Sequence, residues 1–233
     1  MSKHYLIVGA SSGIGAALLR LLSAKGHEIT HVSRSPGNAP DLLTARGLYW
    51  DVREDDFPVA ELPDRLDGLV YCPGSIRLRP FERLKAAEFR DDLELNLLGA
   101  VRAIQGALKP LKQSGNASVV LFSTVAVQTG MPYHASVAAA KGAVEGLVRS
   151  LAAELAPGVR ANAIAPTVTD TPLAERLLNS DDKRNAAVQR HPLKRVGDAE
   201  EMARTAVWLL DEAPSVTGQI IPVDGGLSSL RLL

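Results

Sequence analysis

Short apolar runs that alternate with longer segments of helical periodicity are the feature that most constrains the fold of this 233-residue chain. The runs are HYLIV, EITHV, GLYW, GLVYC, SVVLF, VRANAI and QIIPV. Apolar runs of this kind are typical of strands buried on both faces, and helical segments between them are typical of crossovers in a parallel sheet. The sequence therefore predicts an α/β fold with one doubly wound, seven-stranded parallel sheet and helices on both faces.

The segments between the runs predict the helices. IGAALLRLLSAKG has apolar residues at helical spacing and ends on Gly26, a residue suited to a left-handed cap. Further helices are expected from about Ala86 to Leu111, from about Ala135 to Ala156, and through DAEEMARTAVWLLDE with Asp198 as its N-cap. Residues 34–47 leave room for only a short helix. Ligands of such folds bind at the carboxyl ends of the strands.

Composition limits the class of partner. With 46% hydrophobic and 22% charged residues, residues 1–233 can form one domain around a sizeable core. The 26 basic and 26 acidic residues give zero net charge, which provides no basic field for nucleic acid. Cys72 has no partner for a disulfide, the apolar start breaks at Gly9 before a signal peptide is complete, and no apolar run approaches the roughly 18 residues of a membrane helix. We expect a cytoplasmic protein with small-molecule partners or copies of itself, and neither nucleic acid nor a membrane as partner.

A glycine-rich loop follows the first predicted strand. In VGASSGIGAALL, Gly9, Gly13 and Gly15 precede or open a helix, so the backbone can turn tightly and approach a pyrophosphate whose charge the helix N-terminus stabilises. The spacing differs from the common G-x-G-x-x-G. The alternative is a tight strand-to-helix turn without a ligand.

These segments resemble the short-chain dehydrogenase/reductase family over nearly the whole chain. GASSGIG resembles the family's glycine motif, LELNLLGA its asparagine segment, VVLFSTVA its serine strand, AKGAVEGLVRSLAAEL its lysine helix, and VRANAIAP and TGQIIPVDGG its last two strands. The chain departs from the family at Val8, where threonine is usual, and in CPG, where only Gly74 matches the Asn-Asn-Ala-Gly turn. The resemblance implies a single-domain Rossmann fold and a nicotinamide-dependent oxidoreductase.

The end of the second strand predicts the choice of cofactor. An acidic residue there would bind the ribose of NAD, whereas a basic residue accommodates the 2′-phosphate of NADP(H). This chain has Ser33 and Arg34 and no carboxylate, which favours NADP(H); the alternative is a solvated loop arginine. The resemblance also places Asp51 against the adenine amine and Val52 beside the ring, although Asp51 can instead cap its turn.

The remaining cofactor contacts follow from the resemblance. Thr167 stands where the family has glycine in the loop after the sixth strand, and about residues 171–191 form the expected substrate lid. Thr171 can bind the cofactor or cap a helix. The expected cofactor-binding residues are Gly9, Ser11, Ser12, Gly13, Ile14, Gly15, Ser33, Arg34, Asp51, Val52, Gly74, Asn96, Lys141, Pro166, Val168, Thr169 and Thr171.

The reacting end departs from the family at one position. The resemblance implies catalytic roles for Asn96, Lys141 and a strand hydroxyl, which is Thr124 or Ser123. Four residues before Lys141, where the family has a tyrosine as proton donor, this chain has Val137.

Two nearby side chains are candidates for a relocated acid. Tyr133 and His134 precede Val137 by four and three residues, about one helical turn. The alternative is that they pack or contact substrate. No metal site is expected.

Two functions therefore remain open: an NADP(H)-dependent oxidoreductase for a small carbonyl or alcohol substrate with an atypical proton donor, and an NADP(H)-binding regulatory or assembly protein without turnover. A homotetramer or homodimer is expected through two long helices and the apolar tail LSSLRLL. The small residues on these helices are Gly99, Ala100, Ala103, Gly106 and Ala107, and Ala143, Gly146, Ala152 and Ala153.

Overall fold

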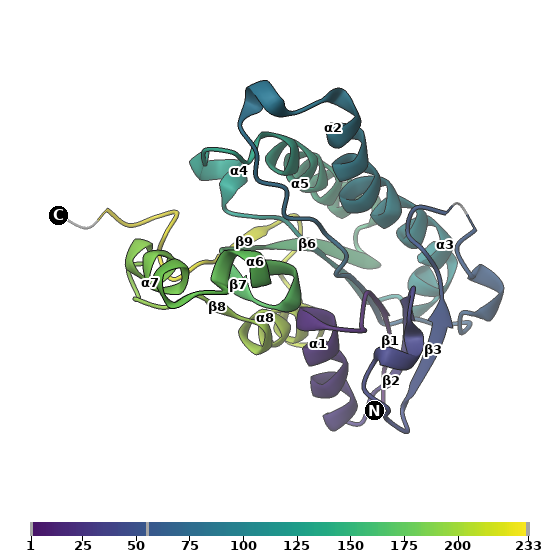
Figure 1. The fold of residues 1–233 in the computed structure, drawn as a ribbon. Coiled ribbons are helices and arrows are strands. Elements are labelled where there is room, and N and C mark those ends of the chain that lie inside the picture. Colours follow the sequence, from purple (N-terminus) through teal and green to yellow (C-terminus); the bar gives the residue numbers. More distant parts are fainter. Residues whose placement is uncertain (1, 55, 232–233) are drawn as a thin grey trace.

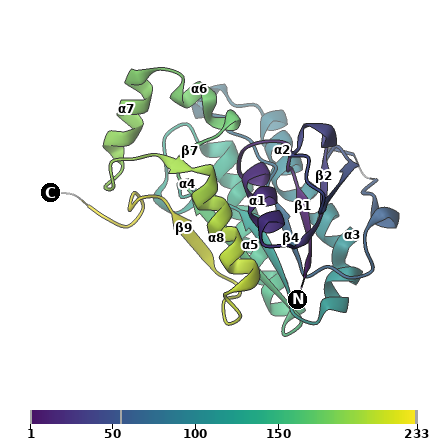
Figure 2. The same cartoon turned by 90° about the horizontal axis from the view of Figure 1, so that it is seen from below.

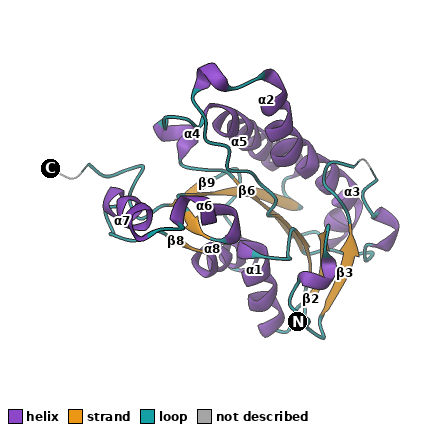
Figure 3. Cartoon of the chain, in the orientation of Figure 1, coloured by secondary structure: helices purple, strands orange, loops and turns teal. Residues whose placement is uncertain are grey.

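The computed structural model describes residues 2–54 and 56–231 and confirms the predicted parallel sheet. Within this part of the chain, seven parallel strands follow the order β3-β2-β1-β4-β5-β6-β9, and the sheet runs between two helical layers (Figure 3). Each predicted apolar run overlaps one strand. The strands are β1 (His4–Val8), β2 (Glu28–Ser33), β3 (Ala45–Tyr49), β4 (Gly68–Tyr71), β5 (Ala117–Phe122), β6 (Val159–Pro166) and β9 (Ile220–Val223).

The strand order reverses between β1 and β4, so their carboxyl ends diverge into a crevice. Helices α1 (Gly13–Ala24) and α8 (Ala199–Asp211) cover one face of the sheet, and α3 (Gly99–Ser114) and α5 (Ala135–Leu155) cover the other (Figures 1 and 2). Alternate side chains of β1 enter the two cores: Tyr5 and Ile7 pack with α1 and α8, whereas Leu6 and Val8 pack with α3 and α5. The sheet is therefore buried on both faces, as the apolar runs predict.

The predicted helix from Ala86 to Leu111 is divided into three segments. Helix α2 (Ala86–Leu93) leads into a π-helical segment, η4 (Glu94–Leu98), and then into α3, which ends at Ser114 before the left-handed Gly115. π-Helical turns inside α-helices are frequent at functional sites. Here the π turn carries Asn96, one of the predicted catalytic residues.

The shorter elements connect these layers. The short helix expected after β2 is a single 3-10 turn, η1 (Pro36–Asn38). Two further 3-10 turns, η2 (Val59–Glu61) and η3 (Phe81–Arg83), precede α2, and α4 (Ala126–Thr129) follows β5. The lid segment contains η5 (Pro172–Ala174), α6 (Glu175–Leu178) and α7 (Asp181–Arg190), and it lies beside a small parallel pair, β7 (Thr169–Asp170) and β8 (Gly197–Asp198). The pair was not predicted, because two-residue strands have no apolar run.

Asp198 occupies the N-cap position of α8, but the predicted cap bond is not formed. Its carboxylate instead lies 4.0 Å from Arg204 of the same helix. Asp198 is also the last residue of β8, and this pairing fixes its backbone. The position was therefore predicted correctly and the interaction was not.

The small residues of α3 pack within the chain, which corrects their predicted use between subunits. A Cβ atom at Gly99 would lie 2.3 Å from the Tyr71 hydroxyl, and one at Gly106 would lie 2.4 Å from the Phe57 ring. Ala100, Ala103 and Ala107 are fully buried in the core, where they bring α3 close to the sheet. On α5, Ala152 is likewise buried in the core, whereas Gly146 is exposed with open space around it.

The segment after β9 runs outward past α7 (Figure 1). The last two residues of the predicted apolar tail lie outside the described residues. No helix in residues 2–54 and 56–231 has the length and apolar character to cross a membrane.

Candidate functional site: a dinucleotide crevice at the sheet edge

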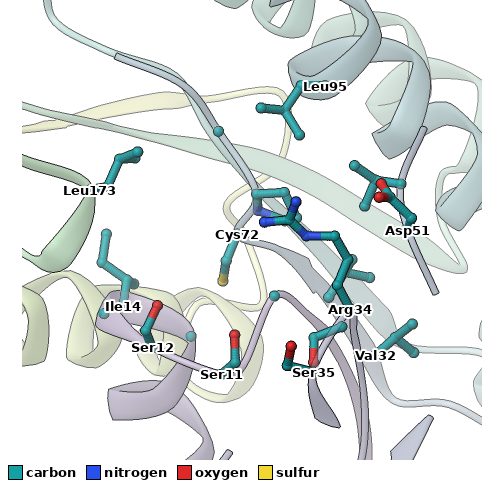
Figure 4. Close-up of a pocket in the computed structure, with 18 of the residues that line it drawn as sticks. Ser11, Ser12, Ile14, Val32, Arg34, Ser35, Asp51, Cys72, Leu95 and Leu173 are labelled. Atoms are coloured by element: carbon teal, nitrogen blue, oxygen red, sulfur yellow. The ribbon is translucent and has the colours of Figure 1, made fainter. Parts of the chain in front are cut away.

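A pocket of about 400 Å³ opens at the carboxyl ends of β1, β2 and β4 (Figure 4). Its walls come from the loop between β1 and α1, the turns after β2, β3 and β4, and the start of the lid. Most of the predicted cofactor residues meet here. Those that line the pocket are Gly9, Ser11, Ser12, Gly13, Ile14, Gly15, Ser33, Arg34, Asp51, Val52, Gly74 and Thr171.

Each glycine of the loop meets a separate geometric demand. Gly9 and Gly13 have φ angles of +86° and +55°, a region that side chains rarely adopt. A Cβ atom at Gly15 would lie 2.1 Å from the Gly9 oxygen, so only glycine allows α1 to start this close to the strand. The side chain of Ser12, the N-cap of α1, makes no cap bond. The first N–H groups of α1 therefore remain available to an anion in the pocket.

The turns after β2 and β3 each bring an arginine to the pocket. Figure 4 shows Arg34 reaching from the end of β2 into the cavity, and Arg53 also lines it. The hydroxyl of Ser33 is buried and has no hydrogen-bond partner among the described residues. Two guanidinium groups and a free hydroxyl suit a phosphate group.

Asp51 caps its turn and also lines the pocket. Its Oδ1 accepts a 3.0 Å hydrogen bond from the main-chain N–H of Arg53, so it does cap its turn. The residue also lines the pocket beside Val52. Arg53 was not predicted, because β2 and β3 are adjacent in the sheet but their ends lie far apart in the sequence.

The turn after β4 brings Cys72, Pro73 and Gly74 to the pocket. Pro73 packs against the loop, since its ring lies 3.1 Å from the position of a Cβ atom at Gly9. Burial raises the pKa of the Cys72 thiol to about 12, partly offset by the charge of Lys141. At neutral pH this thiol is protonated and a weak nucleophile.

Asn96 and Lys141 both lie next to Gly74, which lines the pocket, although neither of the two side chains lines it. The Asn96 Oδ1 and Lys141 Nζ atoms lie 3.3 Å and 3.4 Å from the position of a Cβ atom at Gly74. Lys141 Nζ donates a 2.8 Å hydrogen bond to the main-chain oxygen of Phe122. Burial lowers the pKa of Lys141 to about 8, while the charges of Cys72 and Asp92 act in the opposite direction. The predicted asparagine and lysine are therefore brought together.

The two candidate strand hydroxyls have different surroundings. Ser123 is buried and its hydroxyl donates a 2.8 Å hydrogen bond to Glu145 of α5. Thr124 is partly exposed, and its hydroxyl accepts a 3.3 Å hydrogen bond from the N–H of Ala126. Thr124 is thus the hydroxyl that is not committed to a buried carboxylate.

The first turn of α5 contains the valine in place of the family's tyrosine. Val137 is 5% exposed, and Ser136 before it has a buried hydroxyl without a partner among the described residues. Tyr133 is 57% exposed with a left-handed φ of 71°. The Nδ1 atom of His134 lies 2.7 Å from the Pro132 oxygen. Neither Tyr133 nor His134 lines the pocket.

The loop after β6 contributes one pocket residue at its far end. Thr171 lines the pocket, and its hydroxyl donates to the Thr169 oxygen at 3.2 Å, so the alternative role as a helix cap is not seen. Thr169 is buried and donates to the Thr167 oxygen at 3.0 Å. Val168 packs against the lid, and Pro166 ends β6. Pro166, Val168 and Thr169 do not line the pocket.

The lid contacts the same cavity through Pro172 and Leu173. Its own small core consists of Ala174, Leu178 and Ala187, with Val168 and Val196 packed against it. His191 at the end of α7 is buried, and its Nε2 lies 2.7 Å from the Thr167 hydroxyl. The lid is therefore anchored to the loop after β6.

A family model described as Enoyl-(Acyl carrier protein) reductase matches residues 9–228. Cis-4-hydroxycyclohexanecarboxylate dehydrogenase from Sinomonas cyclohexanicum is 34% identical, over 97% of this chain and 96% of the relative. The 3-oxoacyl-[acyl-carrier-protein] reductase FabG from Thermotoga maritima is 33% identical, over 97% of each chain. The ligand-free aldohexose dehydrogenase structure from Thermoplasma acidophilum superposes with a TM-score of 0.91 at 28% identity, covering 100% of this chain and 96% of that one.

Proposed function

The chain belongs to the short-chain dehydrogenase/reductase family, and on that premise we propose that it is an NADP(H)-dependent oxidoreductase that interconverts a small carbonyl compound and its alcohol. The observation that carries the proposal is that Asn96 and Lys141 lie together next to Gly74, which lines the same pocket as the glycine loop. Relatives named as dehydrogenases and reductases support the reaction class.

Recognition of NADP(H) is assigned to the turns after β2 and β3. Arg34 and Arg53 would bind the 2′-phosphate, and the unpartnered hydroxyl of Ser33 would add a hydrogen bond. The glycine loop and the start of α1 would hold the pyrophosphate. The absence of an acidic side chain at Ser33 and Arg34 disfavours NAD(H).

At the reacting end, the cofactor supplies or accepts hydride when it is bound. Lys141 would bind the nicotinamide ribose, and Thr124 would donate a hydrogen bond to the substrate oxygen. Asn96 would fix a water beside the lysine. Because residue 137 is valine, the proton must come from another group, for which Tyr133, His134 and solvent are the candidates.

A second function, cofactor binding without turnover in a regulatory or assembly role, is favoured by one specific observation. Val137 has no transferable proton at the position of the family's acid. Lys141 would still be retained for ribose binding alone, and a fold does not guarantee its usual chemistry.

The two functions are separated by one paired experiment on the native protein. NADPH binding is titrated by its fluorescence, and NADPH oxidation is followed over a panel of aldehydes, ketones and acyl thioesters. Binding with turnover of a panel member supports the oxidoreductase. Binding with no turnover across the panel supports the second function, and failure to bind NADPH contradicts both.

A further inference from the structure

Asp92, in the last turn of α2, carries a carboxylate that is 1% exposed. Its Oδ1 accepts a 2.7 Å hydrogen bond from the hydroxyl of Ser75 and lies 3.7 Å from Nε of Arg77. Its Oδ2 is buried without a hydrogen-bond partner in the described part of the chain. A buried carboxylate with one free oxygen costs folding free energy, which points to a role other than stability.

A chain of polar contacts leads from Asp92 to the inner end of the crevice. Ser75 also accepts a 2.9 Å hydrogen bond from Nδ2 of Asn96, and the same Nδ2 donates to the main-chain oxygen of Asp92 at 2.8 Å. These two bonds fix the carboxamide with Oδ1 next to Gly74, where Lys141 Nζ also lies. Asn96 Oδ1 has no partner among the described residues. The chain of hydrogen bonds from the carboxylate through the hydroxyl to the amide therefore ends at an acceptor without a partner among the described residues, close to Gly74 and the lysine.

The ammonium group of Lys141 can donate more hydrogen bonds than the one to Phe122. An ammonium group has three donors, and the hydrogen bond from Lys141 Nζ to the Phe122 oxygen uses one of them. Asn96 Oδ1 and Lys141 Nζ both lie near Gly74, so an ordered water bound there would have two polar partners. Helix α2 packs against α5, so the carboxylate and the ammonium belong to neighbouring elements.

We propose that Asp92 is a positioning residue for proton transfer at Lys141: through Ser75 it fixes the Asn96 carboxamide, and its carboxylate on α2 is coupled electrostatically to the lysine on α5. A protonated lysine matters most in a site without the family's phenol, because it is then the charged donor nearest to the missing acid. The catalytic meaning of this role rests on the proposed function. The charge coupling between Asp92 and Lys141 does not.

The ionisable groups around this pair are few. Lys141 is faced by the thiol of Cys72 from the end of β4 and by Asp92 from α2, and burial lowers its pKa more than these neighbours raise it. Glu145, one turn further along α5, is bound to Ser123 and Arg149. Asp92 is faced by Arg77 from the loop after β4. Because the Cys72 thiol is protonated at neutral pH, Asp92 is the resident negative charge that opposes the deprotonation of Lys141.

The coupling is tested on the cofactor-free protein by NMR. The Cε resonance of Lys141 is titrated with pH in protein labelled with carbon-13 lysine, and it is assigned by its loss in Lys141→Met. Asp92→Asn is expected to lower the midpoint by about one pH unit, the effect of losing a nearby opposite charge. Asp91→Asn is the matched control, because Asp91 is the exposed neighbour on the same helix and loses the same formal charge. Its midpoint is expected to stay at the native value.

A second variant tests the same coupling in case Asp92→Asn does not fold. Asp92→Leu has a similar volume and removes the buried carboxylate together with its unpaired Oδ2. It must lower the midpoint in the same direction as Asp92→Asn. A native midpoint in a folded Asp92 variant overturns the proposal.

Turnover provides an independent readout. With any panel substrate that is reduced, Asp92→Asn is expected to shift the alkaline limb of the pH profile of kcat downward by the same unit, which is about a tenfold loss on that limb. A purely structural defect would lower kcat equally at every pH. A shifted NMR midpoint without turnover in the native protein contradicts the proposed function and leaves the coupling standing, whereas turnover with an unshifted midpoint contradicts the coupling alone.

Discussion

The ammonium group of Lys141 is bound to the main-chain oxygen of Phe122, the last residue of β5, at 2.8 Å. This bond joins α5 to the strand end that precedes Thr124, so the lysine and the candidate hydroxyl are positioned by one contact. The lysine side chain is nevertheless buried, and burial lowers its pKa to about 8. Titratable side chains whose pKa is strongly shifted by burial are typical of functional sites.

The first prediction concerns the stability cost of this lysine. Its pKa is lower in the folded protein, at about 8, than the ordinary value of 10.5, so the folded state binds the proton less tightly than the unfolded chain. Stability is therefore reduced below the folded pKa, and the cost disappears as pH rises from about 8 to 10.5. We expect Lys141→Met to raise the free energy of unfolding of the cofactor-free protein by about 2 kcal/mol at neutral pH.

Urea denaturation measures this gain, which is expected to shrink as the pH approaches the ordinary lysine value. Lys109→Met, at an exposed position of α3, is the control and should change stability little. Destabilisation by Lys141→Met at neutral pH would contradict the assigned cost of burial.

The second prediction concerns cofactor preference. We expect Arg34→Ala and Arg53→Ala each to weaken NADPH binding by about 1–3 kcal/mol and to leave NADH binding nearly unchanged, because each loses a charged hydrogen bond to the 2′-phosphate. Fluorescence titration with both cofactors measures the difference. Arg83→Ala, an exposed arginine far along the chain from both turns, should affect neither cofactor. An equal loss for NADPH and NADH, or equal native affinities, would rule out the 2′-phosphate assignment.

The sheet and the glycine loop could be predicted because their physical causes are local. A run such as VVLF is apolar throughout since both of its faces are buried, and Gly15 is required because a Cβ atom there would meet the Gly9 oxygen. The pairing of Asn96 with Lys141 followed from the family resemblance, and the structure brings the two residues together. These features can therefore be read from short segments.

Other parts of the site depend on contacts between distant segments. Ser123 is directed to Glu145, 22 residues away, which the sequence alone could not distinguish from an orientation toward the crevice. Asp92 lies in the charged stretch FRDDLE, which has the composition of an exposed helix surface, yet the packing of α2 against α5 buries it. Composition alone does not predict that a polar residue is buried between two helices, because its burial depends on the helix that packs against it.

The third prediction concerns assembly. Gly146 on α5 is exposed and has open space where a Cβ atom would lie outside its own helical turn, and the tail after β9 extends past α7 (Figure 1). We expect a homodimer or homotetramer in which α5 packs closely against α5 of a second copy, and Gly146→Arg to dissociate it. Light scattering at micromolar concentration measures the mass. Gly37→Arg, at another position with open space, should leave the mass unchanged; a monomeric native protein would contradict the prediction.

The fourth prediction concerns the two candidate acids. Once a reduced substrate is known, we expect either Tyr133→Phe or His134→Ala to lower kcat by about 10²–10⁴-fold, since that is the typical contribution of a general acid. Tyr133 lies in the loop that contacts Arg79, and the ring of His134 is held by the Pro132 oxygen. Loss in one variant identifies the relocated acid. Undiminished kcat in both variants would leave solvent or the substrate as the proton source.

The last prediction restores the missing phenol. Val137 is four residues before Lys141 and is buried in the first turn of α5, so Val137→Tyr is expected to place a phenol next to the lysine and raise carbonyl reduction by about 10²–10⁴-fold. Overpacking opposes the change by about 1–3 kcal/mol, which a thermal denaturation curve would show. Ala139→Tyr places the same phenol on the exposed face of the same helix and should give no increase. If Val137→Tyr folds and binds NADPH but reduces no more than the native protein across the panel, residue 137 is not the site of the missing acid, or the substrate is not a carbonyl compound.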